Sequence, residues 1–458
     1  MALMKSISGI RGTIGGKPGE NLSPVDIVKF TAAFGTIIAD NNSKKIVIGR
    51  DGRISGEMIK NLVVSTLTGL GLDVVDLGIS TTPTVEIAVK MENAAGGIII
   101  TASHNPKEWN ALKLLNSEGE FISAEEGERV LQLAEKEDFQ FAPVERLGFH
   151  TVNDSYLQKH IDAILDYDLV DVKAIKKRKF KVVVDAINSS GATYVPALLR
   201  ALGVEEIFLL NGEINGRFAH NPEPLPEHLR ELSNEVNKQG ADLGIAVDPD
   251  VDRLCFVCED GSMFGEEYTL VAVADYVLSK RPGNTVSNMS STRALKDVTV
   301  KNGGEYFPSA VGEVNVVKKM KEVSAVIGGE GNGGIIVPDF HYGRDALIGI
   351  GLFLSHLAKS KKSAKQLRNS YPDYVMSKNK IDLGNGVDLK PIFEKIQKKY
   401  KNQPINTEDG IKIEFDTGWV HLRPSNTEPI IRIYSESNFE TTAQNMAHRL
   451  MQDIREFM

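Results

Sequence analysis

Cysteine is scarce in this chain, which has only two in 458 residues. So low a count is typical of a protein of a reducing, cytoplasmic compartment. Long apolar runs are also missing, because no stretch is long enough to span a bilayer and the first residues lack the apolar core of a signal peptide. We therefore expect a cytoplasmic protein that does not interact with membranes.

An excess of positive charge is missing too. Lysine and arginine number 53 against 61 aspartates and glutamates, for a formal net charge of -8. This balance argues against a nucleic-acid partner and against binding to an anionic membrane. The apolar and charged fractions, 41% and 25%, are those of a soluble globular protein. The length is sufficient for several domains with buried cores.

The two cysteines, Cys255 and Cys258, have the C-x-x-C spacing of some metal and redox sites. They lie in an apolar run, 254–258, that is typical of a buried strand, where positions three apart face opposite sides of the sheet. The chain has no second pair to complete a zinc site. We predict that both cysteines are structural.

A pattern of strand, helix and strand recurs three times, over 45–78, 181–210 and 285–307. It favours three related mixed α/β domains, although one large sheet can produce the same repeat. The tail differs, since 390–454 reads as two helices flanking short strands, which indicates a smaller α+β domain. Polar stretches predict four domains, with these bounds: 1–150, 151–260, 261–370 and 371–458.

The hexapeptide Thr-Ala-Ser-His-Asn-Pro occupies 101–106, directly after an apolar run. The predicted strand would place Ser103 and His104 on a tight turn that Asn105 and Pro106 close. A serine held on a rigid turn can carry a phosphoryl group in covalent catalysis. An ordinary turn at the end of a strand is the alternative.

A second motif, Asp-Pro-Asp-Val-Asp-Arg, covers 248–253 and again follows an apolar strand. Carboxylates at alternate positions can converge on one hard cation, for which Mg²⁺ fits best, and Arg253 could hold a phosphate oxygen. An EF-hand is excluded, since Arg253 stands where that loop requires glycine and strands flank the motif. A solvated acidic turn is the remaining alternative.

Two further loops carry polar groups suited to binding hydroxyl and phosphate groups. In the glycine-rich stretch 328–334, Glu330 and Asn332 are of a type that binds hydroxyl groups, although a flexible turn would look similar. In 423–429, Arg423 can form a fork on a phosphate between two predicted strands, with a plain hairpin as the alternative. The strand after this loop contains Arg432, whose direction the alternation of side chains leaves open.

Arg11 and Lys113 are the last candidates. Arg11 lies in a glycine-flanked loop near the start, and Lys113 follows the serine motif. An isolated lysine is usually solvated, but one close to arginines and a phosphate pocket can have its pKa lowered toward a general acid or base.

In this order, the motifs resemble those of the α-D-phosphohexomutase superfamily, and the resemblance covers nearly the whole chain. It implies a heart-shaped enzyme of four domains around a central cleft. Three domains would share a mixed α/β fold, and the fourth would resemble the TATA-binding protein.

The resemblance also implies a role for each candidate. Ser103 is similar to the phosphoserine, with His104 beside it to orient the phosphate, and Arg11 and Lys113 are similar to the general acid/base region. One Mg²⁺ per chain would be bound by the phosphoserine and three carboxylates: Asp248, Asp250 and Asp252. Substrate binding would fall to seven residues: Arg253, Glu330, Asn332, Arg423, Ser425, Asn426 and Thr427.

The chain departs from its relatives at several positions. It has Gly334 where they often have histidine, Asn332 where many have serine, and Ala111 where glycine is common. The missing histidine shifts the acid/base role toward Lys113. His341 could replace it, but we expect a surface histidine there.

The implied reaction moves a phosphoryl group from Ser103 to a hexose or hexosamine monophosphate, through a bisphosphate that turns over within the site. A hexose 1,6-bisphosphate would act as activator. Overall the chain is most similar to the archaeal-type and Bacteroidetes-like branch labelled phosphoglucosamine mutase, which favours glucosamine 6-phosphate and glucosamine 1-phosphate as the substrate pair. The triplet 425–427 also resembles phosphomannomutase/phosphoglucomutase, the main alternative. A phosphatase, a non-catalytic sugar-phosphate sensor, and a monomeric or homodimeric state stay open.

Overall fold

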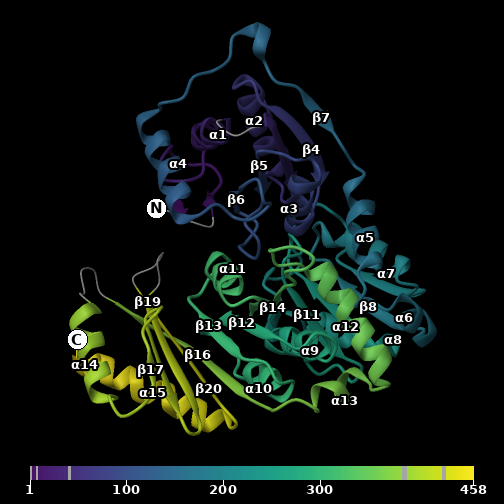
Figure 1. The fold of residues 1–458 in the computed structure, drawn as a ribbon, viewed down its shortest axis with the longest axis vertical. Helices are drawn as coiled ribbons and strands as arrows, with labels where there is room; N and C mark the ends of the chain where they lie inside the picture. Colours follow the sequence, from purple (N-terminus) through teal and green to yellow (C-terminus); the bar gives the residue numbers. More distant parts are fainter. Residues whose placement is uncertain (1–2, 7–8, 40–42, 384–388, 425–429, 458) are drawn as a thin grey trace.

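The computed structural model describes residues 3–6, 9–39, 43–383, 389–424 and 430–457. Over these residues the chain forms four sheets, which follow one another along an arc from the first sheet at the top of Figure 1 to the C-terminal sheet at the lower left. No helix in the described part of the chain is long and apolar enough to cross a membrane.

The first sheet is mixed, and its described strands run in the order β1-β2-β6-β5-β3-β4-β7. The strands are β1 (Met4–Ser6), β2 (Gly9–Thr13), β3 (Lys45–Arg50), β4 (Asp73–Ile79), β5 (Gly96–Ile100), β6 (Trp109–Leu115) and β7 (His150–Val152). The helices are α1 (Pro24–Ala39), α2 (Gly56–Gly69), α3 (Thr82–Met91) and α4 (Ala124–Lys136), with a 3₁₀ turn, η1 (Val144–Arg146).

Helices cover this sheet on both faces, which explains why its central strands are continuously apolar. Side chains alternate along β3, so that Ile46 and Ile48 pack into one apolar cluster and Val47 into another. The first cluster includes residues of α1, α2 and α4, and the second includes residues of α3.

The second and third sheets are smaller. The second contains β8 (Lys181–Asp185), β9 (Glu206–Leu210), β10 (Leu243–Val247) and β11 (Leu254–Cys258), with helices α5 (Tyr156–Asp166), α6 (Val172–Arg178), α7 (Gly191–Ala201) and α8 (Arg230–Gln239) and the turn η2 (Pro226–His228). The third contains β12 (Asn284–Asn288), β13 (Tyr306–Ser309), β14 (Ala325–Glu330) and β15 (Gly334–Ile336), with helices α9 (Glu266–Leu278), α10 (Ala294–Lys301), α11 (Glu313–Glu322), α12 (Ala346–Ser360) and α13 (Ala364–Arg368).

The same strand pattern is present in all three sheets. Three parallel strands lie side by side, as β4-β3-β5, β9-β8-β10 and β13-β12-β14. An antiparallel strand then pairs with the last of them, namely β6, β11 and β15. The serine, aspartate and glycine-rich motifs occupy the equivalent connection in each sheet, so the repeat brings three related loops to one site.

The second and third sheets share one apolar core. Phe256 of β11 stacks on Phe353 of α12 with ring centroids 3.8 Å apart, and both belong to a cluster that includes residues of α7, α9 and α12. The cysteines are confirmed as structural, since both are buried and free. Cys258 packs in this shared cluster, whereas Cys255 packs in a cluster on the opposite face of β11.

The C-terminal sheet is antiparallel, in the order β16-β20-β19-β18-β17. Its elements are β16 (Val375–Asp382), α14 (Leu389–Lys399), β17 (Ile405–Asn406), β18 (Ile411–Phe415), β19 (Gly418–Pro424), β20 (Ile430–Ser437) and α15 (Glu440–Phe457). The helices pack through Ile396 and Leu450 on strand residues such as Leu422. The predicted fold class, three related mixed α/β units followed by a smaller α+β unit, is therefore confirmed.

Candidate active site

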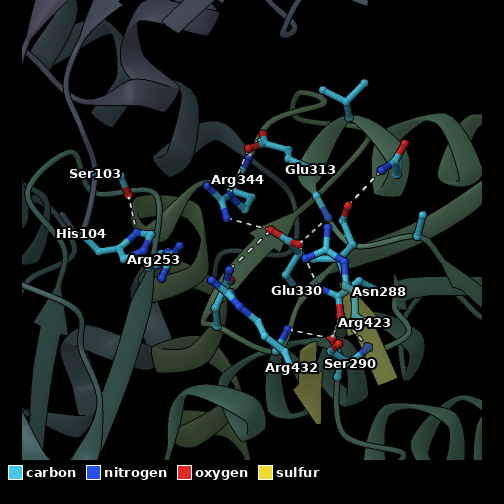
Figure 2. Close-up of a pocket in the computed structure, with 18 of the residues that line it drawn as sticks. Ser103, His104, Arg253, Asn288, Ser290, Glu313, Glu330, Arg344, Arg423 and Arg432 are labelled. Atoms are coloured by element: carbon cyan, nitrogen blue, oxygen red, sulfur yellow. Dashed lines mark hydrogen bonds and ion pairs between the residues drawn. The ribbon is translucent and has the colours of Figure 1, made fainter. Parts of the chain in front are cut away.

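Residues from all four sheets line one cleft of about 1050 Å³. Ser103 and Lys113 come from the first sheet, Arg253 from the second, Glu330 from the third and Arg423 from the fourth. Figure 2 shows Ser103 and His104 at the left, Glu330 near the centre, and Arg423 and Arg432 below Glu330. Residues predicted separately from five short motifs thus meet in a single site.

Ser103 is held toward the aspartate loop. Its backbone has a φ of 48°, in the left-handed region that side chains rarely adopt, and only 2% of the residue is exposed. The backbone N–H donates to Thr101 Oγ1 at 2.9 Å, and the Oγ hydroxyl donates to Asp248 Oδ2 at 2.7 Å. The serine therefore has a fixed direction, as a phosphate carrier requires.

Arg53 holds the serine loop in place through hydrogen bonds to its backbone. Its side chain is fully buried, and its Nε pairs with Asp51 Oδ2 at 3.0 Å. The guanidinium also donates at 2.5–2.8 Å to the backbone carbonyls of three loop residues and of the first residue of β6: Ser103, Asn105, Pro106 and Trp109. Sequence reasoning missed Arg53. The available signal was its position just after the apolar strand β3, which pairs with β5 and therefore ends beside the serine loop.

The three aspartates converge as predicted. Asp248, Asp250 and Asp252 are fully buried between β10 and β11, and one ligand oxygen of each lies within 4.8 Å of the others. Oδ1 of Asp250 and Oδ1 of Asp252 are buried and have no hydrogen-bond partner among the described residues. Buried polar atoms are nearly always paired, so these two oxygens fit a hard cation, which takes oxygen ligands. The triad can bind a metal ion.

The pKa shifts of the aspartates also favour a bound cation. Burial and the carboxylates of Asp252 and Asp250 raise the pKa of Asp248 well above its ordinary value. Burial also opposes ionisation of Asp252, but Arg344 and Lys113 outweigh it and lower the pKa of that carboxyl. A bound cation would relieve the repulsion among the three groups.

Lys113 lies on β6, with its ammonium among the aspartates. Nζ lies 2.7 Å from Asp250 Oδ2 and 3.1 Å from Asp252 Oδ2, and the side chain is 3% exposed. The expectation of a lowered pKa is wrong. Burial alone would lower the pKa of Lys113, but the two carboxylates outweigh it and raise the pKa above the ordinary value. The residue is therefore an ammonium in this geometry.

Arg11 and His104 lie beside the serine. Arg11 Nη1 donates to Asn105 Oδ1 at 2.7 Å, and burial lowers its pKa to about 10, so it stays charged. His104 Nδ1 lies 3.4 Å from Ser103 Oγ. Burial, with the charges of Arg253 and Arg11, lowers the pKa of His104 well below its ordinary value. His104 is therefore a neutral hydrogen-bonding group at neutral pH.

Glu330 ends β14 with its carboxylate in the cleft. It accepts hydrogen bonds from Asn288 Nδ2 at 2.8 Å and from the backbone N–H of Gly312 at 3.1 Å. Burial opposes its ionisation, but Arg344 and Asn288 outweigh it and lower the pKa of Glu330. Asn332 Nδ2 lies 3.5 Å from the same carboxylate. Glu330 and Asn332 thus line the cleft side by side, and their binding of hydroxyls stays a prediction, whereas Asn288 was not predicted.

Arg344 is a second residue that sequence reasoning missed. Its guanidinium lies in the cleft between the aspartate loop and Glu330, and it contacts three carboxylates. The contacts are Nη2 to Asp252 Oδ2 at 2.7 Å, Nη1 to Glu330 Oε2 at 2.8 Å, and Nε to Glu313 Oε2 at 3.0 Å. Nothing in its sequence neighbourhood distinguishes it from a surface arginine.

The predicted phosphate-binding arginines lie in two parts of the cleft, Arg253 beside the aspartate loop and Arg423 in the C-terminal sheet. Arg253 Nη1 pairs with Glu223 Oε1 at 3.0 Å, and its Nε is buried with no hydrogen-bond partner among the described residues. Arg423 pairs through Nε with Asp409 Oδ2 at 2.7 Å and stands opposite Arg432 on the neighbouring strand.

Arg432 also lines the cleft, which settles the direction that the sequence left open. Three other predicted substrate-binding residues lie outside the described residues: Ser425, Asn426 and Thr427.

His341 is not the surface residue that we expected. Only 7% of its side chain is exposed, since Nδ1 lies 3.4 Å from Glu86 Oε2 and Nε2 lies 3.1 Å from Asp345 Oδ2. The carboxylate of Asp345 also contacts His160 at 3.0 Å. His341 thus belongs to a buried polar network that joins α3, α5 and the start of α12.

Comparison with known proteins gives consecutive matches along the chain. Models of the phosphoglucomutase/phosphomannomutase alpha/beta/alpha domains I, II and III match residues 4–141, 158–261 and 265–374, and the model of the C-terminal domain of the same family matches residues 384–453.

Relatives match over nearly the full length. A Thermococcus kodakarensis protein named phosphoglucomutase/phosphomannomutase is 39% identical over 441 residues, which cover 94% of this chain and 95% of that protein. A Sulfurisphaera tokodaii phosphoglucosamine/phosphogalactosamine mutase is 32% identical over 98% of each chain. Among solved structures, a phosphoglucomutase/phosphomannomutase family protein from Burkholderia thailandensis superposes with a TM-score of 0.84 at 27% identity, covering 99% of this chain and 97% of its own.

Proposed function

The chain belongs to the phosphoglucomutase/phosphomannomutase family, and from this premise we propose that it interconverts glucosamine 6-phosphate and glucosamine 1-phosphate. Membership of this family makes it a mutase, an intramolecular phosphotransferase. The observation that supports our assignment of residues most directly is the hydrogen bond of 2.7 Å from Ser103 Oγ to Asp248 Oδ2. It sets the serine hydroxyl against a triad in which two oxygens, without a hydrogen-bond partner among the described residues, suit a cation.

In the proposed reaction, phospho-Ser103 transfers its phosphoryl group to a free hydroxyl of the sugar monophosphate. The bond between phosphorus and the serine oxygen breaks, and a bond to the sugar oxygen forms. The resulting bisphosphate reorients in the cleft, and its other phosphoryl group returns to Ser103. One Mg²⁺, held by Asp248, Asp250 and Asp252 with a phosphoserine oxygen, would neutralise charge on the transferred group.

The side chains of the cleft have separate proposed tasks. Arg11 and Arg253 face the reacting phosphate, and the free Nε of Arg253 is suited to one of its oxygens. In each transfer one proton passes from the attacking hydroxyl to the oxygen that leaves phosphorus. Lys113 would protonate the leaving oxygen and then take up the proton of the attacking hydroxyl. Its ammonium form, which the aspartates favour, suits the step in which an oxygen leaving phosphorus is protonated.

The opposite side of the cleft would hold the phosphate that does not react. Arg423 and Arg432 line the cleft on neighbouring strands of the C-terminal sheet, apart from Ser103 in the view of Figure 2. Glu330 and Asn332 would hold hydroxyls of the sugar between the two phosphate positions. A sugar that turns end over end exchanges its phosphates between these positions, so each position must accept either phosphate.

The choice of sugar rests on the relatives. The Sulfurisphaera tokodaii relative is named for hexosamines, which supports a hexosamine substrate. The Thermococcus kodakarensis relative is named phosphoglucomutase/phosphomannomutase and has the higher identity, 39%, which supports glucose and mannose phosphates as the alternative.

The deciding experiment compares kcat/KM for glucosamine, glucose and mannose phosphates, with Mg²⁺ and a hexose 1,6-bisphosphate present. A kcat/KM at least tenfold higher for glucosamine 6-phosphate supports the proposal. An equal or higher value for glucose or mannose phosphate overturns the sugar assignment and leaves the mutase reaction in place.

A further inference from the structure

Gly334, the first residue of β15, lies against the side chain of Arg344. A Cβ added at position 334 would stand 2.3 Å from Arg344 Cδ and 3.1 Å from its Cγ. Real Cβ atoms do not approach other atoms so closely, so any side chain at 334 would displace the arginine. The backbone of Gly334 is not in the left-handed region. The space, not the backbone conformation, is what requires glycine here.

The arginine that fills this space joins two loops of different sheets. Asp252 belongs to the aspartate loop after β10, and Glu330 ends β14. One planar guanidinium reaches Asp252 Oδ2 at 2.7 Å and Glu330 Oε2 at 2.8 Å, while its third edge faces Glu313. Because the fork is rigid, it sets the separation and the relative direction of the two carboxylates.

We propose that Arg344 is a positioning residue for the phosphoryl transfer and that Gly334 leaves the space that the Arg344 side chain occupies. The guanidinium fixes the sugar-binding carboxylate of Glu330 with respect to the aspartate triad. It thereby sets the distance between the sugar hydroxyl and the phosphoserine. This inference rests on the proposed function, and it gives a role to two residues that had none from the sequence alone.

Charge neutralisation alone is a weaker explanation of Arg344. A lysine at 344 would supply the same charge, but its single ammonium cannot bridge both carboxylates in a fixed geometry. The two roles therefore differ in what Arg344→Lys does. If only charge matters, the conservative variant retains activity, and if positioning matters, it does not.

The test is a double-mutant cycle of Gly334→Ala, Arg344→Lys and the two combined, read as kcat/KM with the free energy of unfolding measured in parallel. Each single variant is expected to lower kcat/KM by about 10- to 100-fold, the effect of losing one or two charge-assisted hydrogen bonds. The combined variant is expected to lie within about threefold of Arg344→Lys, because both changes remove the same contact. Gly127→Ala and Arg281→Lys serve as controls, since Gly127 lies on α4 and Arg281 pairs with surface aspartates.

A second measurement separates positioning from general damage. Sugar phosphate analogues that each lack one ring hydroxyl are compared with the parent sugar in the wild-type enzyme and in Arg344→Lys. The analogue with the largest penalty in the wild-type enzyme should lose most of that penalty in the variant, since Glu330 is no longer held against the missing hydroxyl.

Two results overturn the inference if the wild-type enzyme is an active mutase. One is that the losses of kcat/KM in the two single variants add up in the combined variant, and the other is that the analogue penalty is the same in Arg344→Lys as in the wild-type enzyme. If Arg344→Lys does not fold, Gly334→Ala decides alone, and a wild-type kcat/KM in that variant contradicts the proposal. A wild-type enzyme without mutase activity on any of the three sugars overturns the proposed function, and this inference falls with it.

Discussion

Ser103 Oγ lies 2.7 Å from Asp248 Oδ2, although 145 positions separate the two residues in the chain. Both stand on the connection from a parallel strand to its antiparallel neighbour, in the first sheet and in the second. The contact exists because two copies of the same strand pattern face each other across the cleft. Each motif is ordinary by itself, and the chemistry arises where the repeats meet.

Mg²⁺ should stabilise the folded protein as well as support activity. Oδ1 of Asp250 and Oδ1 of Asp252, which have no partner among the described residues, would gain one, and a cation at 100 times its Kd adds about 2.7 kcal/mol to the free energy of unfolding. Thermal unfolding with and without Mg²⁺ measures the effect, and Asp252→Asn should reduce it. An equal shift in both proteins would show that the ion binds elsewhere.

Arg53→Lys should loosen the serine loop. The lysine keeps the charge beside Asp51 but loses most of the hydrogen bonds to the loop carbonyls. We expect unfolding to become easier by at least about 2 kcal/mol and kcat to fall about tenfold or more. Chemical denaturation and steady-state kinetics check both values. The control is Arg281→Lys, whose ion pair with the exposed Asp168 should be worth no more than about 1 kcal/mol.

His421 should make folding sensitive to acid. Its Nδ1 lies 2.9 Å from Ser290 Oγ, its Nε2 lies 2.6 Å from the backbone carbonyl of Asp409, and burial lowers its pKa to about 4. The unfolded chain then binds a proton near pH 6.5, whereas the folded chain binds it only near pH 4. The contribution of neutral His421 to the free energy of unfolding is therefore fully present above pH 6.5. About 3 kcal/mol of it is lost as the pH drops to 4.

Urea denaturation at several pH values between 7 and 4, on the wild-type protein and on His421→Gln, isolates this contribution. The variant should lose less stability over that range. Parallel curves for the two proteins would assign the acid sensitivity to other groups.

Arg423→Met should weaken binding of the phosphate that does not react. Loss of a charged fork is expected to raise KM by about 10- to 100-fold and to leave kcat less affected, since the residue lies away from Ser103. Arg455→Met, on the exposed side of α15, is the control in the same domain. A fall in kcat with unchanged KM would place Arg423 in the chemical step instead.

Features that depend on a local pattern of residues, such as strands and the loops that follow them, were predicted correctly from the sequence. An apolar strand followed by a short polar motif located the loops of Ser103, Asp248 and Glu330, and strand alternation placed Cys255 and Cys258 in the core. The fold class followed from the repeat of strands and helices. The domain boundaries at 150, 260 and 370 stay predictions.

The misses share one physical cause, which is that a contact between distant segments decides the role of the residue. Arg53 and Arg344 acquire their roles from carbonyls and carboxylates far along the chain. Lys113 was expected near arginines but lies between two aspartates, so the direction of its pKa shift was wrong. His341 is buried against Glu86 of α3, which its own sequence neighbours do not indicate.

The central claim is that Ser103 carries the phosphoryl group during turnover. Its most direct test is intact-mass and peptide-mapping spectrometry of the protein after incubation with Mg²⁺ and a hexose 1,6-bisphosphate. We predict a form heavier by one phosphate that maps to Ser103, is absent in Ser103→Ala, and exchanges its phosphate for that of an isotopically labelled sugar monophosphate when this substrate is added. An active enzyme with no phosphate on Ser103, or with its phosphate on an aspartate, would contradict the account.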